Sequence, residues 1–166
     1  MKPFFALSIL LGACCAGCLH YSFKNPFPLP FRSIAVVVAA GDAWTHHGDD
    51  LLATELRREL ATCPSLSLAD KNADAILEVA LTSCFQIATG TAATDSRRAA
   101  CYDLRLTASC TLKDCRSGRE YCSDRPVEAR VYYSAGPSAI GNRQDAMPAL
   151  AQELARRIRD LVLGPW

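Results

Sequence analysis

The chain has 166 residues, a formal net charge of +1 and nine cysteines, and half of its residues are hydrophobic. The length predicts a single domain that can bury its own core, and the hydrophobic fraction excludes intrinsic disorder. The near-zero charge argues against a protein that binds nucleic acid by bulk electrostatic attraction. Nine cysteines are too many for an ordinary reduced cytosolic protein, so we expect either a metal site or an oxidising compartment.

The first 18 residues, MKPFFALSILLGACCAGC, have the pattern of a bacterial lipoprotein signal peptide. A lysine precedes an apolar run that is too short to span a bilayer, and small residues and cysteines follow at once. Leu11-Gly12-Ala13-Cys14 fits the lipobox best, while Cys18 gives a more usual signal length, so both stay open. We expect a signal peptide at 1–17 and a diacylglycerol plus an N-acyl chain on Cys14 or Cys18, which together anchor a protein stably. An ordinary secretory signal is the alternative.

The rest of the chain divides into a tether at 18–31, rich in proline and aromatic residues, and a single domain at 32–166. The β-branched run from Ser33 to Ala40 is typical of a buried strand. A helix is expected from Gly48 to Thr62, because leucines recur on one face and two aspartates occupy its first turn.

Three strands are predicted next, over residues 75–87, 102–112 and 119–133, with residues 89–99 as a polar loop. A uniform register between the last two strands would place Leu104 opposite Glu128, so we predict a bulge near Asp124 to Pro126. Alternation in the first of the three strands places one set of apolar side chains on the core face: Leu77, Val79, Leu81, Phe85 and Ile87.

A final helix is predicted from Asp145 to Val162, with Pro148 in its first turn. The order strand, helix, three strands, helix predicts an α+β fold, a two-layer sandwich. Its sheet would be four-stranded and mostly antiparallel, with both helices on the apolar face. The polar face would be open to water or to a partner.

Six cysteines lie in the domain, an even number that indicates disulfides in an exported protein. The alternation of side chains along the strands, with a hairpin that pairs Ala88 with Arg97, places cysteines of neighbouring strands opposite each other. One further pair of cysteines lies at the same end of the sandwich. Their spacing does not match a zinc site. The expected bridges link Cys84 with Cys101, Cys110 with Cys122, and Cys63 with Cys115, the alternative for Cys110 being a buried thiol.

The sequence contains no motif of a serine hydrolase, a zinc metalloprotease or a phosphate-binding loop. His46 and His47 lie close to Asp49 and Asp50, a cluster with the chemistry of metal ligands. We favour the interpretation that they are ordinary polar residues at the start of a helix, because their spacing does not define a set of metal ligands. We therefore expect no catalytic residue, no metal and no cofactor.

Short motifs occur in order along the mature chain. They are a Cys-Leu-His-Tyr start at 18–21, a Pro-Leu-Pro segment entering a strand at 28–36, a Leu-Arg-Arg-Glu-Leu helix core at 56–60, an Ala-Asp-Ala-Ile-Leu strand entry at 73–77, and a hairpin with Tyr102, Leu112, Asp114, Ser117 and Gly118. In these motifs and in the order of its elements, the chain resembles the lipopolysaccharide-assembly lipoprotein family, LptE. The turn after the first strand and the three predicted disulfides depart from the family pattern.

The resemblance implies a protein that is not an enzyme and that its lipid anchors on the periplasmic face of the outer membrane. It implies an LptD-type β-barrel as partner and a role in delivering lipopolysaccharide to the cell surface. Because lipopolysaccharide carries phosphates, exposed arginines would contact it. The candidates by hairpin position are Arg97, Arg98, Arg116 and Arg119, with ordinary solvated charges as the alternative.

A second function stays open, because fold alone does not separate small envelope lipoproteins. In that alternative the chain is an accessory subunit or an activator of a cell-wall synthase or transporter.

Overall fold

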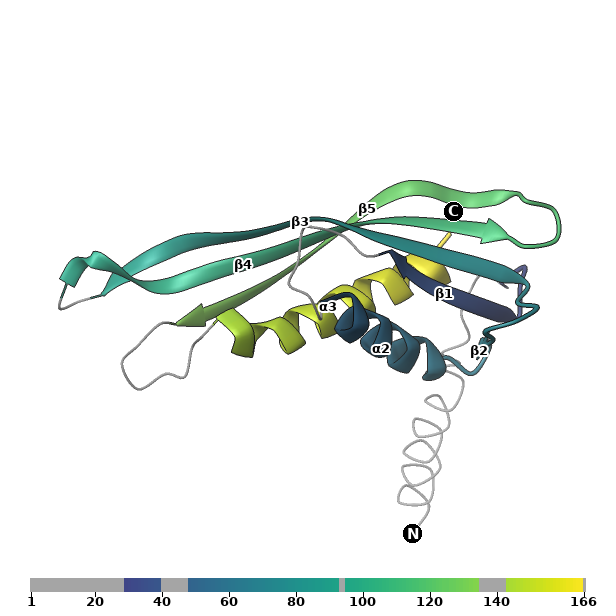
Figure 1. Ribbon diagram of the computed structural model, residues 1–166, viewed down its shortest axis with the longest axis horizontal. Helices are drawn as coiled ribbons and strands as arrows, with labels where there is room; N and C mark the ends of the chain where they lie inside the picture. The colour runs from purple at the N-terminus through teal and green to yellow at the C-terminus, as the bar shows by residue number, and fades with distance from the viewer. Residues whose placement is uncertain (1–28, 40–47, 93–94, 135–142, 166) are drawn as a thin grey trace, which may run out of the picture.

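The computed structural model describes residues 29–39, 48–92, 95–134 and 143–165, without the side chains of 91–100 and of Gln144. Both predicted helices and all four predicted strands are present, and one short strand is added (Figure 1). In chain order the elements are β1 (Ser33–Ala39), α2 (Gly48–Ala61), β2 (Ser67–Leu68), β3 (Ala75–Ala92), β4 (Asp95–Asp114), β5 (Glu120–Ser134) and α3 (Arg143–Leu163).

The sheet has five strands in the order β2-β1-β3-β4-β5, and it is mixed rather than mostly antiparallel and four-stranded. β1 runs parallel to β2 and β3, whereas β3, β4 and β5 form the expected antiparallel meander. The parallel pairing follows from α2, because a helix between two neighbouring strands carries the chain back to the starting edge. β2 has only two residues, both exposed, so it has no periodicity that sequence analysis could detect.

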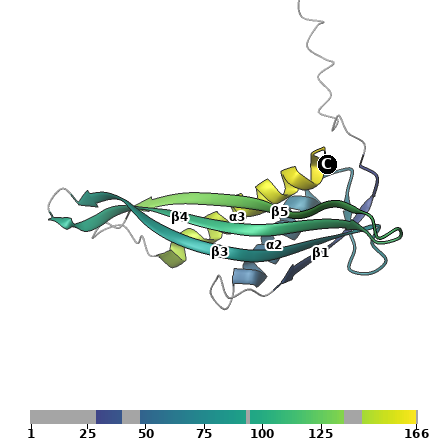
Figure 2. The same cartoon turned by 90° about the horizontal axis from the view of Figure 1, so that it is seen from above.

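The two helices pack together beneath one face of the sheet and leave the other face uncovered by any described element (Figures 1 and 2). The core between the layers is apolar, with Leu56 of α2, Leu106 of β4 and Leu154 of α3 all fully buried. Phe31, which we assigned to the tether, is also buried in this core. The α+β two-layer sandwich is therefore confirmed.

β3 and β4 form a hairpin that projects past the helices (Figure 1). The two strands pair as far as Ala92 and Asp95, so the polar loop predicted at 89–99 is wrong. This segment contains Thr89 and Thr91, whose β-branched side chains fit a strand despite the polar composition. We call the tip of this hairpin the far end of the sheet, and the opposite end, where β1 begins, the arm end.

A bulge in β3 changes which face its side chains occupy. Leu81 lies opposite Ala108 and Ser83 opposite Thr107, so Thr82 is an extra residue. Because side chains alternate along a strand, one extra residue moves every later side chain to the other face. Leu81 is buried as expected, but Phe85 and Ile87 are 58% and 45% exposed on the outer face. Our placement of these two residues in the core is wrong for this reason.

The bulge predicted in the last strand is confirmed. Cys110 lies opposite Arg125 and Leu112 opposite Cys122, so β5 has one residue more than β4 across this step. Asp124 lies at this extra residue and has a positive φ of 47°, a conformation that aspartate tolerates better than most residues. Its backbone N–H donates to Thr111 Oγ1 at 3.1 Å, and its carboxylate accepts from Ser109 Oγ at 3.3 Å.

Candidate functional site

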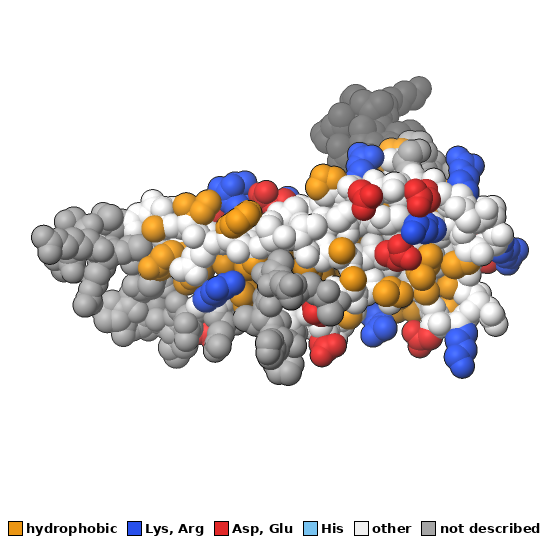
Figure 3. Space-filling view, turned by 45° about the horizontal axis from the view of Figure 1, so that its top comes forward, with side chains coloured by type: hydrophobic (Ala, Val, Ile, Leu, Met, Phe, Trp, Pro, Cys, Tyr) orange, Lys and Arg blue, Asp and Glu red, His pale blue; other side chains and the backbone are white. Residues whose placement is uncertain are grey.

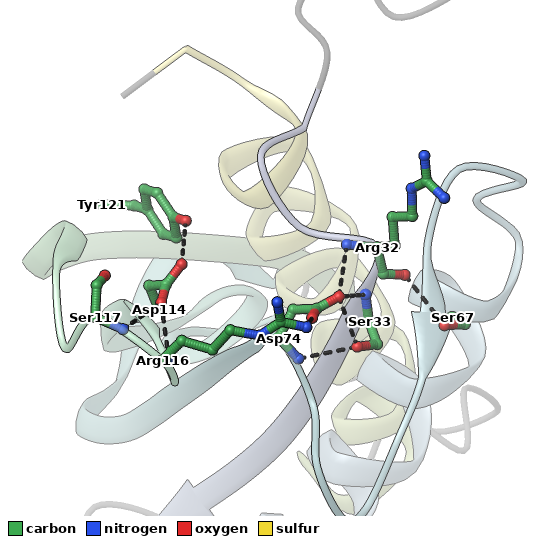
Figure 4. A network of polar contacts seen from close by, with 8 residues as sticks. All are labelled: Arg32, Ser33, Ser67, Asp74, Asp114, Arg116, Ser117 and Tyr121. Carbon is green, nitrogen blue, oxygen red and sulfur yellow. Dashed lines mark hydrogen bonds and ion pairs between the residues drawn. The ribbon is translucent and has the colours of Figure 1, made fainter.

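A network of polar contacts closes the arm end of the sheet, where the described chain enters the domain (Figure 4). Its centre is Asp74, the residue immediately before β3. Asp74 Oδ2 accepts hydrogen bonds from the backbone N–H of Arg32 at 3.1 Å, from the backbone N–H of Ser33 at 3.2 Å and from Ser33 Oγ at 3.0 Å. The backbone N–H of Asp74 donates back to Ser33 Oγ at 2.9 Å. One carboxylate therefore holds the first residues of β1 in place.

The same carboxylate joins the arm to the turn between β4 and β5. Arg116 lies in that turn, and its guanidinium contacts Asp74 Oδ1 at 2.8 Å. The backbone N–H of Cys115 also donates to the carbonyl of Asp74 at 2.8 Å. The hydrogen bond from the backbone of Arg32, with those from Ser33, lowers the pKa of Asp74 below its usual value. Asp74 therefore stays ionised at neutral pH, and two distant segments share its charge.

Asp114 organises the turn itself. Its Oδ1 accepts from the backbone N–H groups of Ser117 at 2.7 Å and Arg116 at 2.9 Å, and its Oδ2 accepts from the Tyr121 hydroxyl at 2.9 Å. The N–H of Ser117, with these other donors, lowers the pKa of Asp114 to about 2. Gly118 completes the turn with a φ of 69°, where the absence of a Cβ avoids strain.

The network explains several motifs that carried the family resemblance. Ser33, Asp74 and Asp114 come from three motifs that are far apart in the sequence, and the fold brings all three to the arm end. In the sequence these residues are only parts of motifs, and no role was predicted for them. An aspartate directly before or after a predicted strand could have indicated this network. At such a position the carboxylate can accept hydrogen bonds from free backbone N–H groups.

Arginines and acidic residues are both present at the arm end. The guanidinium of Arg119 lies 5.9 Å from the centre of the Tyr121 ring, a cation–π contact, and Tyr121 packs on Phe31. Within the described part of the chain, no carboxylate forms an ion pair with Arg119 or Arg32, whereas Arg116 is paired with Asp74. Arg119 and Arg32 are therefore two cations at this end that have no carboxylate partner among the described residues.

The four arginines proposed as lipopolysaccharide contacts do not form one site. Arg97 and Arg98 belong to β4 near the far end, and their side chains lie outside the described residues. Arg116 and Arg119 lie at the arm end. Consecutive hairpins of a meander turn at opposite ends of a sheet, so both pairs cannot contact the same phosphate group (Figure 1).

The structure forms no disulfide among the six cysteines of the described domain. Cys84 lies opposite Leu106 and Cys101 opposite Gly90, so the expected register is wrong. Five residues of β4 separate the two positions, roughly 16 Å, far beyond the span of a disulfide. The basis for an 84–101 bridge is therefore absent.

The other two predicted bridges remain predictions. Cys110 lies opposite Arg125 and not opposite Cys122, so the register expected for this pair is also wrong. Both cysteines are nevertheless buried on the inner face, and Cys110 is two residues from Leu112, which lies opposite Cys122. Burial raises the pKa of Cys110 to about 12 and also raises that of Cys122. Cys63 is buried after α2, and Cys115 is exposed in the turn after β4.

The described residues contain no cluster of three or more histidine, cysteine or acidic side chains that could hold a metal ion. His46 and His47 lie outside those residues, whereas Asp49 and Asp50 occupy the first turn of α2 as predicted. No described helix is both long and apolar enough to cross a bilayer.

The fold is that of several small bacterial lipoproteins of known structure. One from Caulobacter crescentus CB15 is 22% identical with a TM-score of 0.53, covering 78% of this chain and 87% of its own. A minor lipoprotein of Acinetobacter baumannii is 18% identical with a TM-score of 0.54 over 82% and 93% of the two chains. Lipoprotein B of Nitrosomonas europaea is 14% identical with a TM-score of 0.55 over 81% of each. At these identities the likeness concerns the fold alone.

The family follows from the sequence of the folded part. Residues 31–161 match the family model of LptE, described as lipopolysaccharide-assembly. This span covers most of the chain, so the protein belongs to the LptE family. A comparison with curated proteins gives no match.

Proposed function

We propose that the protein is a lipid-anchored, non-enzymatic component of the lipopolysaccharide assembly machinery of the outer membrane. It partners an LptD-type β-barrel and aids the delivery of lipopolysaccharide to the cell surface. The observation that carries the proposal is the family match over residues 31–161, which spans every described strand and nearly all of α3.

The arm end supports a role for the anchor in positioning the domain. A lipid on Cys14 or Cys18 would lie at the head of the segment that enters the domain at Leu29. Because Asp74 ties Arg32 and Ser33 to the sheet, the point at which this segment enters the domain is fixed. Arg32 and Arg119 lie at the same end of the sheet, and their charges would attract the phosphates of anionic lipids near such an anchor.

Co-purification tests the proposed partner. The full-length chain, tagged at its C-terminus, is expressed in its native bacterium and extracted in mild detergent, and proteins that remain bound are identified by mass spectrometry. We expect an LptD-type barrel in stoichiometric amount. Recovery of a peptidoglycan synthase or a transporter subunit in its place, without any barrel, would favour the accessory-subunit alternative.

Two single substitutions test the anchor. Cys14→Ala and Cys18→Ala are compared for membrane association and for the mass of the mature N-terminal peptide. We expect one variant to lose the lipid and enter the soluble fraction, since the acyl chains supply most of the membrane affinity, while the other stays bound. If both variants remain lipid-free but exported, an ordinary secretory signal explains the first 18 residues.

A further inference from the structure

β1 lies at one margin of the sheet, and most of its free side has no described strand beside it (Figure 2). β2 pairs with only the first two residues of β1, and the last hydrogen bond on that side runs from the backbone N–H of Ala69 to the carbonyl of Ile34 at 3.0 Å. Because backbone groups alternate along a strand, the N–H and C=O of Val36 and Val38 face the same side as those of Ile34. No described backbone group pairs with them there. We call residues 35–39 the open edge.

The two edges of the sheet differ in their protection against another strand. Edge strands present unpaired backbone groups, and proteins commonly blunt them with charges, proline or a bulge. β5, at the opposite edge, has all three: five charged side chains, Pro126 and the bulge at Asp124. β1 has the sequence SIAVVVA, without a charge or a proline, and its register with β3 is continuous. The open edge is therefore apolar and suited to pairing with a further strand.

A groove of about 340 Å³ lies beside the open edge. It is lined by β1, by β2 with the two residues after it, and by one residue of α2: Ile34, Val36, Arg57, Leu68, Ala69 and Asp70. Val36 is only partly buried against the core and Leu68 is 39% exposed, so apolar surface remains open on this flank. Figure 3 shows hydrophobic side chains gathered over the half of the molecule that contains β1, with charged side chains among them. Apolar side chains of an added strand would cover this surface.

The two charged residues of the groove are of opposite sign. Arg57 belongs to α2 and Asp70 follows β2, and neither forms an ion pair with another described residue. Arg58, the next residue of the helix, is instead paired with Glu55 at 3.9 Å. A lipid or sugar phosphate that approached Arg57 would also meet the negative charge of Asp70, whereas a polypeptide can present an acidic and a basic side chain together. The charges of the groove therefore favour a polypeptide.

We propose that the open edge binds an extended segment of a partner protein, which adds to the sheet as a strand. Its backbone pairs with Val36 and Val38, its apolar side chains enter the groove, and side chains of both charges meet Arg57 and Asp70. A second copy of this chain fits less well, because β2 occupies the edge before Ala35 and two copies could pair only along the open edge. A stable dimer interface, by contrast, buries roughly 1,200–2,000 Å². The inference goes beyond the proposed function and does not depend on the barrel.

Amide hydrogen exchange tests the pairing residue by residue. The mature full chain, isotope-labelled and in detergent micelles, is studied by NMR with and without the peptide acetyl-Lys-Thr-Val-Thr-Val-Thr-Glu-amide, which has lysine, both valines and glutamate on one face. Without peptide, we expect Val36 and Val38 to exchange faster than Val37, whose N–H faces β3. Peptide at about ten times its Kd should slow exchange at Val36 and Val38 by about tenfold and leave Val37 unchanged. Unchanged exchange at Val36 and Val38 would overturn the proposal.

Charge reversal tests the groove. Arg57→Glu should weaken binding of the peptide by about fivefold, as for the loss of one exposed ion pair, and a peptide that ends in lysine in place of glutamate should restore it. Arg58→Glu is the matched control, because Arg58 is the neighbouring exposed arginine and does not line the groove. This variant should bind the peptide as the unsubstituted chain does. Equal weakening by both variants would indicate general electrostatic attraction and would overturn the groove as the binding site.

Exchange without peptide also identifies a different occupant of the open edge. Slow exchange at Val36 and Val38 that becomes slower with rising protein concentration would place a second copy there. Slow exchange at every concentration would show that the chain covers the edge itself. Either result overturns the proposal. Recovery of the barrel does not enter these measurements, so the proposed function would stand in both cases.

Discussion

Individual carboxylates decide how the arm end is held together. Asp74 and Asp114 together accept hydrogen bonds from backbone groups of β1 and of the β4–β5 turn, from Ser33 and from Tyr121. These donors stabilise the charged form, which is the reason that both pKa values are lowered. The residues that sequence analysis singled out at this end, Arg116 and Arg119, are arranged around these two acids.

The lowered pKa of Asp114 predicts a pH-dependent contribution to stability. A carboxyl whose folded pKa is below its unfolded value of about 3.9 stabilises the protein above that value and loses this contribution as pH falls towards about 2. Asp114→Asn should therefore lower the urea midpoint at pH 7, and the difference from the unsubstituted protein should shrink between pH 5 and pH 2. A difference that is constant over this range would show that ionisation of Asp114 does not contribute.

The cysteines are predicted to differ in reactivity. In the reduced, folded protein, Cys101 and Cys115 are exposed, whereas Cys110 is buried with its pKa raised to about 12. The thiolate is the reactive form, so iodoacetamide at pH 8 should label the two exposed thiols first and Cys110 only on unfolding. Mass spectrometry of timed samples gives the order. Peptide mapping of the unreduced protein separately tests the bridges 110–122 and 63–115.

At the scale of elements, single extra residues in the strands set which side chains meet the core. Thr82 in β3 and the step around Asp124 in β5 each change the register by one residue. The second was predictable because Leu104 and Glu128 would otherwise have been opposed. The bulge at Thr82 was not predictable. Without it, the alternation places the apolar residues Phe85 and Ile87 in the core, and no polar residue in the core contradicts that placement.

The turn between β4 and β5 gives a prediction of its own. Gly118 has a φ of 69°, and a Cβ placed on it would have no atom within 4 Å. Gly118→Ala should therefore cost about 1 kcal/mol of unfolding free energy through backbone strain alone. Gly118→Asn should cost less, because asparagine tolerates this conformation. Urea denaturation of the three proteins measures this, and equal stabilities would mean that the turn relaxes.

For the whole molecule, stability depends on the hydrophobic core between the sheet and the helix layer. Leu154 of α3 is fully buried there, and Leu154→Ala should lower the free energy of unfolding by about 2–5 kcal/mol. Ala149→Ser, on an exposed position of the same helix, is the control and should change stability by less than about 1 kcal/mol. Thermal and urea unfolding give both values. A small effect at Leu154 would indicate that the helix layer packs loosely.

The sequence by itself determined the helices, the long strands, the two-layer architecture and the family, because each depends on periodicity or on short local motifs. Only the tertiary structure decided the mixed sheet, the added strand β2 and the extended β3–β4 hairpin, which depend on pairing between distant segments. It also decided the network at the arm end. Asp74 contacts residues about forty positions away. No local pattern encodes such contacts, since they exist only when the chain is folded.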